Sequence, residues 1–105
     1  MSSRKLKVLF VTSEVYPFVK TGGLADVSSA LPQAISEMGH EVRIVVPKYG
    51  AVDERKFKIH EVVRLKDIQI KIGDKDVTFS LKSCFLPGQK VRVQIYFLAL
   101  VDQHF

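Results

Sequence analysis

The sequence predicts an α/β fold in which a buried parallel sheet carries an attached antiparallel β-hairpin. The runs "LKVLFVTS" and "EVRIVVP" are apolar without alternating polar residues, which is typical of parallel strands buried on both faces. Apolar residues three and four apart lie between the two runs and indicate a helix. The later sequence alternates apolar and polar residues, as strands with one face in water do. The order strand, helix, strand predicts a crossover unit with parallel strands.

The predicted helix follows a glycine-containing loop and ends at Gly39. Its apolar positions are Leu24, Val27, Leu31, Ile35 and Met38. This spacing places the five side chains on one face of the helix. We therefore expect that face to cover the sheet.

Further strands are predicted after the second buried strand. The stretches "FKIHEVVRLKDIQIKIG" and "VTFSLKSCF" flank "GDKD", which predicts a hairpin turn. A last run, "VRVQIYFLAL", is apolar enough to return to the interior of the sheet. The sequence then predicts one helix for several strands, although helices normally cover both faces of a parallel sheet. We expect part of the sheet to lie uncovered and the isolated chain to be only marginally stable.

Composition narrows the classes of function. The chain has 105 residues, of which 47% are hydrophobic, enough for the core of one domain. Its net charge of +5 arises from basic residues scattered among acidic ones, which does not favour a nucleic-acid surface. The single cysteine, Cys84, cannot form an intrachain disulfide, and no Cys/His cluster has metal-ligand spacing. No apolar run reaches the roughly 18 residues of a membrane helix. We expect a cytoplasmic protein with no metal, membrane or nucleic acid.

The segment "KTGGLAD", between the first strand and the helix, predicts an anion site. Gly22 and Gly23 would allow positive φ and close approach of a ligand, while the first helix amides would point at it. Lys20 adds a positive charge that suits a phosphate or diphosphate. Asp26 would repel a phosphate placed too close, so we interpret it as an acceptor for a sugar hydroxyl.

A purely structural interpretation of the same segment is equally open from the residues alone. In that interpretation the two glycines make a tight turn, Lys20 is solvated and Asp26 caps the helix. The G-x-G-x-x-G fingerprint of dinucleotide-binding proteins is absent, which argues against NAD.

The stretch "VTSEVYPFVKTGGLADVSSALPQAI", followed by "GHEVRIVVPKYG", resembles the amino terminus of bacterial glycogen synthases and plant starch synthases. The resemblance is close from Lys7 to Gly50 and holds in outline beyond. It implies a Rossmann-like parallel sheet belonging to a GT-B-type two-domain fold. Residues 1–105 would form part of the amino-terminal domain, and the carboxyl-terminal domain would lie outside this chain. We expect the isolated chain to be inactive.

The resemblance also implies a reaction and roles for individual residues. Two domains close over ADP-glucose, and glucose passes to the 4-hydroxyl of an α-1,4-glucan with retention. Lys20 would be catalytic, contacting the diphosphate beside Gly22 and Gly23, while Asp26 would face the glucose and the acceptor. Glu14 would help to shape this substrate site. ADP-glucose is a substrate, so no cofactor is implied, and a plant enzyme would be plastidial.

Two other functions remain open at this stage. One is a non-catalytic module that binds a nucleotide or a glucan. The other is a different glycosyltransferase that uses another sugar nucleotide on the same fold.

Overall fold

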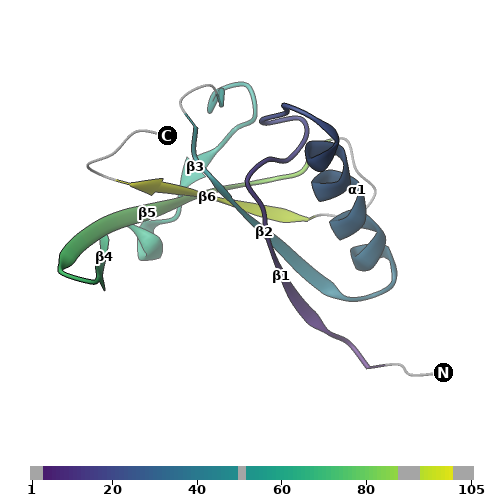
Figure 1. Cartoon of the computed structure of the whole chain (residues 1–105). Coiled ribbons are helices and arrows are strands. Elements are labelled where there is room, and N and C mark those ends of the chain that lie inside the picture. The colour runs from purple at the N-terminus through teal and green to yellow at the C-terminus, as the bar shows by residue number, and fades with distance from the viewer. Residues whose placement is uncertain (1–3, 50–51, 88–92, 101–105) are drawn as a thin grey trace.

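The computed structural model describes residues 4–49, 52–87 and 93–100. Its elements in chain order are β1 (Lys7–Val11), α1 (Gly23–Glu37), β2 (Glu41–Pro47), β3 (His60–Glu61), a 3₁₀ turn (Val63–Leu65), β4 (Ile68–Ile72), β5 (Lys75–Phe85) and β6 (Gln94–Leu100). The strand, helix and strand predicted for the first half of the chain are confirmed. Figure 1 shows α1 beside β1 and β2, with the later strands extending away from it.

All six strands belong to one mixed sheet in the order β1-β2-β6-β5-β3, with β4 also paired to β5. β2 lies between β1 and β6 and runs parallel to both. β5 runs antiparallel to β6, and β3 and β4 run antiparallel to β5. The predicted α/β class, with a parallel part and an antiparallel extension, is therefore confirmed.

One face of the parallel strands carries the core. Ile44 of β2 lies opposite Ile95 of β6 in the register, and both are fully buried. Phe97, also fully buried, contacts the ring of Phe18 from the loop that precedes α1. Burial of these branched and aromatic side chains is the main force that holds the loop on the sheet.

The predicted orientation of α1 is wrong. Its apolar stripe faces solvent, and four of its five members are exposed: Leu24, Val27, Leu31 and Met38. The buried side consists of small residues, namely Ala25, Ser28, Ser29 and Pro32. Small side chains let a helix approach a sheet closely, and the Ser28 hydroxyl meets its polar partner, the hydroxyl of Thr12, at 2.8 Å. Periodicity located the helix correctly, but the more apolar side does not face the sheet.

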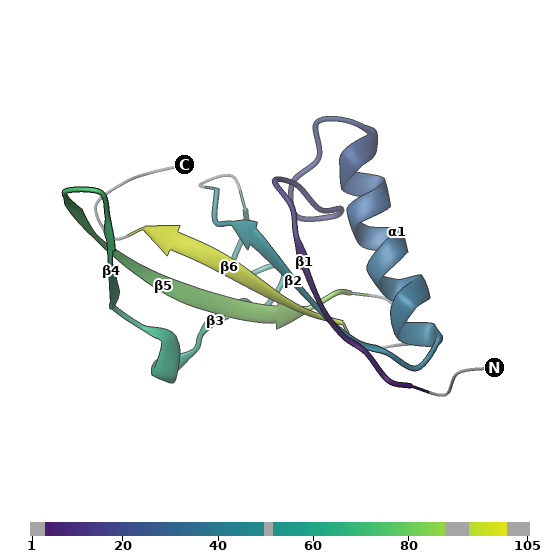
Figure 2. The ribbon, with the colours of Figure 1, turned by 60° about the horizontal axis from the view of Figure 1, so that its bottom comes forward.

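Figure 2 shows α1 on one side of β1 and β2, and no described helix covers the other face of the sheet. Leu9 and Val11 of β1 are exposed, as are Ile70 and Ile72 of β4. A groove of about 480 Å³ lies over the antiparallel part and is lined by Ile70, Ile72, Lys75, Val77, Phe79, Leu98 and Leu100. The expectation of an uncovered sheet face is confirmed for the described residues.

The hairpin is confirmed, although its first arm is shorter than predicted. β4 and β5 are antiparallel, with Ile68 opposite Phe79 at one end of the pairing and Ile72 opposite Lys75 at the other. Gly73 takes a positive φ of 61° in the turn between them. Upstream of β4 the alternating stretch divides into the short strand β3 and the 3₁₀ turn. Asp67, whose φ is 53°, interrupts the extended backbone just before β4.

Candidate functional site

The loop between β1 and α1 lies where β1 ends, and two aromatic contacts anchor it. Phe18 is almost fully buried between Phe57, at 4.5 Å between ring centroids, and Phe97, at 5.1 Å. Within the loop, a β-bridge pairs Val15 with Val19. The carboxyl ends of parallel strands are where open α/β sheets bind ligands. The loop that carries Lys20 is therefore fixed to the core at a position suited to a site.

Lys20 and Asp26 form an ion pair at the start of α1. The Lys20 ammonium lies 2.8 Å from one Asp26 carboxylate oxygen and 3.0 Å from the other. The two side chains are 47% and 56% exposed, so both can reach a ligand. The hydrogen bond to Asp26 raises the pKa of Lys20, which keeps the amine charged. The ammonium also lies 5.7 Å from the centre of the Tyr16 ring, within cation–π range.

Glu14 is close to this pair and accepts hydrogen bonds from the backbone of the loop and of the first turn of α1. One of its carboxylate oxygens accepts hydrogen bonds from the Thr21 amide, at 3.1 Å, and from the Thr21 hydroxyl. The other oxygen accepts from the Ala25 amide in the first turn of α1, also at 3.1 Å. These bonds, with that from the Thr21 hydroxyl foremost, lower the pKa of Glu14. Glu14 is 7% exposed, so it is an internal anion at the helix start.

Gly22 and Gly23 lie where predicted, at the N-cap and first residue of α1, but the expected positive φ is wrong. Gly22 is extended, with φ of −171°, a conformation open to any residue. Gly23 is not among the glycines with positive φ. A Cβ on either residue would meet no heavy atom within 4 Å. The described fold therefore does not require glycine at either position.

Thr12 links the loop to the helix through two hydrogen bonds of its hydroxyl group. Its hydroxyl lies 2.8 Å from that of Ser28 and donates to the backbone carbonyl of Glu14 at 3.0 Å. Thr12 and Ser28 are buried, so this short network couples the end of β1 to α1 in the interior of the protein.

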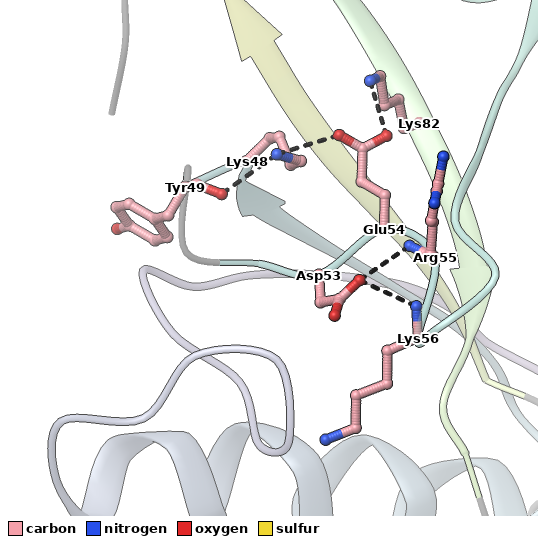
Figure 3. A network of polar contacts seen from close by, with 7 residues as sticks. All are labelled: Lys48, Tyr49, Asp53, Glu54, Arg55, Lys56 and Lys82. Carbon is pink, nitrogen blue, oxygen red and sulfur yellow. Dashed lines mark hydrogen bonds and ion pairs between the residues drawn. The ribbon is translucent and has the colours of Figure 1, made fainter.

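A second polar cluster lies beyond the end of β2 (Figure 3). The Glu54 carboxylate lies between the ammonium groups of Lys82, at 2.8 Å, and Lys48, at 3.2 Å. Lys82 and, to a smaller extent, Lys48 lower the pKa of Glu54 by bonding to its charged form. The cluster pins the loop after β2, from which Phe57 reaches Phe18. The cluster therefore stabilises the loop that carries Lys20 indirectly, through the contact between Phe57 and Phe18.

The described residues contain no group of three or more potential metal ligands among His, Cys, Asp and Glu. None of the helices in the described ranges is long and apolar enough to cross a membrane. The chemistry available at the described loop is thus that of a lysine, two carboxylates, hydroxyl groups and backbone amides.

The structure brings the sequence-predicted residues into one small region. Lys20 contacts Asp26 directly, Glu14 contacts the residues on either side of the glycine pair, and both glycines begin the helix. Sequence reasoning missed Thr21, which binds Glu14 through two groups, and it missed the Thr12–Ser28 bond. The adjacency of Thr21 to Lys20 in "KTGG" was the one available signal for the first.

Comparison with known proteins is decisive about the family. The model of the starch synthase catalytic domain matches residues 7–104. This chain belongs to that family. The glycogen synthase of Chlorobium phaeovibrioides is 47% identical to this family member over 98 residues, which are 93% of the chain and 20% of the relative. The glycogen synthase of Chlorobaculum parvum is 44% identical over 105 residues, covering 100% of the chain and 21% of the relative.

The fold has a solved counterpart in the catalytic domain of starch synthase IV from Arabidopsis thaliana, determined with ADP and acarbose bound. The TM-score is 0.79 at 22% sequence identity, covering 93% of this starch synthase family chain and 19% of the Arabidopsis chain. That likeness shows that this chain has the fold of one part of a GT-B-type catalytic domain. The chain spans about a fifth of the length of the relatives it matches.

Proposed function

We propose that this chain forms the diphosphate-facing part of the amino-terminal domain of a glycogen or starch synthase. The full-length enzyme transfers glucose from ADP-glucose to the 4-hydroxyl of an α-1,4-glucan and retains the anomeric configuration. The bond between the sugar and the diphosphate oxygen breaks and ADP departs. The acceptor's 4-hydroxyl oxygen forms the new glycosidic bond, and its proton passes to the departing ADP or to solvent. ADP-glucose and the glucan are substrates, with no metal or cofactor in the reaction, and the enzyme works in the cytoplasm or, in a plant, in the plastid.

The glycine pair carries this proposal. Gly22 and Gly23 have no conformational requirement for glycine, and the space above them is open. Each glycine also costs more conformational entropy on folding than alanine would. A ligand that approaches the backbone closely at the start of α1 accounts for both glycines, whereas a tight turn does not.

Lys20 supplies the charge that such a ligand needs. Its ammonium group is exposed and charged, six residues before Asp26 and directly before the Thr-Gly-Gly segment. In the proposed mechanism it stabilises the negative charge that develops on the departing diphosphate. A well-placed donor of this kind contributes about 3–4 kcal/mol to the transition state. Asp26 keeps the ammonium near this position and faces the sugar.

The substitution Gly23→Ala tests the proposal in a full-length synthase that contains this segment. The fold has room for the methyl group, so we expect the free energy of unfolding to stay constant or rise by up to about 1 kcal/mol. Steady-state kinetics with ADP-glucose should nevertheless show a higher KM or a lower kcat, because the methyl group occupies the space of the phosphates. Gly73→Ala, in the β4–β5 turn at positive φ, is the opposite control and should lower stability without a specific effect on KM. A Gly23→Ala enzyme with wild-type kinetics would reject the phosphate site.

A further inference from the structure

Beyond the residues that face a ligand, Glu14 is distinctive because its carboxylate is nearly buried and bonded on both oxygens. It accepts hydrogen bonds from Thr21 in the loop and from Ala25 in the first turn of α1, which are four positions apart in the sequence. Lys20 directly precedes the first of these, and the glycine pair lies between them. The carboxylate therefore bridges both ends of the segment that holds the proposed diphosphate site.

From this geometry we infer that Glu14 is a positioning residue, which sets the place of the Lys20 ammonium by holding the Thr21 and Ala25 amides on one carboxylate. The inference rests on the proposed function of Lys20. Glu14 does not bind the substrate in this arrangement, because both of its oxygens accept hydrogen bonds from protein groups. It acts through the backbone on either side of Gly22 and Gly23.

The hydrogen-bond pattern requires a carboxylate rather than an amide. Backbone amides can only donate, and one such amide faces each oxygen of Glu14. Glutamine has the same shape but offers one acceptor and one NH₂ donor. In either orientation of the glutamine, one backbone N–H would face another donor, and that side of the loop would have to move.

Negative charge at this point is also favourable for the helix. Glu14 lies at the positive end of α1, where an anion is stabilised by the first-turn amides. A substrate phosphate therefore meets a helix start whose Ala25 amide is already occupied. Lys20 then becomes the main mobile charge for the diphosphate, and its placement becomes correspondingly important.

A double-substitution experiment in the full-length synthase separates positioning from general stabilisation. We expect Glu14→Gln to lower kcat/KM for ADP-glucose by roughly 100-fold, the effect of a displacement of about 1 Å at a reacting group. If Glu14 acts through Lys20, adding Glu14→Gln to Lys20→Ala should cause little further loss. A residue with only a structural role would instead give the product of the two separate losses, and that result would overturn the inference.

The pair Thr21→Ser and Thr21→Val repeats the test with a smaller change, in case Glu14→Gln does not fold. Serine retains the hydroxyl that donates to Glu14, so we expect near wild-type kcat/KM, while valine removes it and should lower kcat/KM. The valine effect should disappear in the Lys20→Ala background. Equal activity of the two variants, or an undiminished valine effect without Lys20, would contradict the inference.

Glu54→Gln is the matched control for loss of a paired carboxylate. It removes the anion shared by Lys48 and Lys82, outside the loop, and its effect should multiply with that of Lys20→Ala. The two proposals fail in different ways in this design. Wild-type turnover of Lys20→Ala rejects the proposed function, whereas strong loss in Lys20→Ala with independent loss in Glu14→Gln rejects only the positioning role.

Discussion

The Lys20 ammonium is held by both carboxylate oxygens of Asp26, at 2.8 and 3.0 Å, across the mouth of the glycine loop. The pair is half exposed, and its partners belong to different elements, the loop and the first turn of α1. A diphosphate that approaches Lys20 would therefore share the ammonium with Asp26 or displace it. In the proposed function, the pair holds the charged lysine near the diphosphate site before the substrate arrives.

Replacement of Lys20 should affect chemistry more than folding. In a full-length synthase we expect Lys20→Ala and Lys20→Gln to lower kcat by about 100- to 1,000-fold, because both remove the charge at the leaving diphosphate. Lys20→Arg should rescue only partly, since a planar guanidinium cannot occupy the same point as an ammonium. Thermal midpoints should change little, because exposed ion pairs contribute little to stability.

Steady-state kinetics and thermal unfolding on the same preparations check this prediction. If Lys20→Ala keeps the wild-type kcat, or if each variant loses activity only in proportion to its lost stability, then Lys20 serves the fold alone.

Acid should destabilise the chain through Glu14 and Glu54. The pKa of each lies below the ordinary value of 4.5, owing to hydrogen bonds with Thr21 and Lys82 respectively. As pH falls through 4.5, the unfolded chain takes up protons that the folded chain does not, so the free energy of unfolding falls until both folded-state carboxylates are protonated. Urea unfolding from roughly pH 7 to roughly pH 3 measures this loss. Glu14→Gln and Glu54→Gln should each flatten the acid dependence, and unchanged curves would show that these carboxylates are not involved.

Cys84 should be a slow-reacting thiol in the folded chain. It is buried on β5, and burial raises its pKa to about 11, so little thiolate forms at neutral pH. A chromogenic disulfide reagent should label it slowly under native conditions and at once in denaturant. Since it is the single cysteine, the labelling rate follows the opening of this part of the sheet. Rapid labelling of a chain with an intact circular dichroism spectrum would contradict the described burial.

The uncovered sheet face should bind apolar dyes and promote self-association of the isolated chain. Ile70→Thr and Ile72→Thr keep a β-branched side chain on exposed positions, so we expect less dye fluorescence with little change in stability. The same change at Ile44, which is fully buried, should unfold the chain and increase fluorescence. Dye titration and size-exclusion chromatography distinguish these outcomes. A monomer that binds no dye would refute the prediction.

Local sequence patterns predicted the elements well. Unbroken apolar runs located β1 and β2, spacing of three and four located α1, and the hairpin turn followed from its Gly-Asp pair. The expectation that these strands are buried on both faces is wrong for β1, whose Leu9 and Val11 are exposed. The predicted orientation of α1 was wrong. Apolar periodicity identifies the apolar face of a helix, but it does not say whether that face or another one packs against the sheet. The side that meets it is marked by Ala25 and Ser28, which carry almost no periodic signal.

The candidate site was predicted as a set of residues, while its internal connections were not. Spacing and resemblance brought together Lys20, Asp26 and the glycine pair. The bonds of Glu14 to Thr21 and Ala25 depend on how the loop folds back on itself, and the Val15–Val19 bridge that accompanies this fold has no sequence pattern. The expected positive φ at the glycine pair failed for a related reason, since the residue type permits that conformation without requiring it.

The helix α1 packs small residues against the sheet and exposes an apolar stripe to solvent. This arrangement allows the design of a variant of the chain for ligand screening. Polar replacements at Val27, Leu31 and Met38 would resurface the stripe without touching the helix start, because these residues lie one turn or more beyond Gly23. Such a resurfaced chain, if monodisperse, would be small enough for residue-by-residue NMR titration. Weak ligands could then be screened against the candidate site in this chain alone, in a format that a protein of several times its length does not offer.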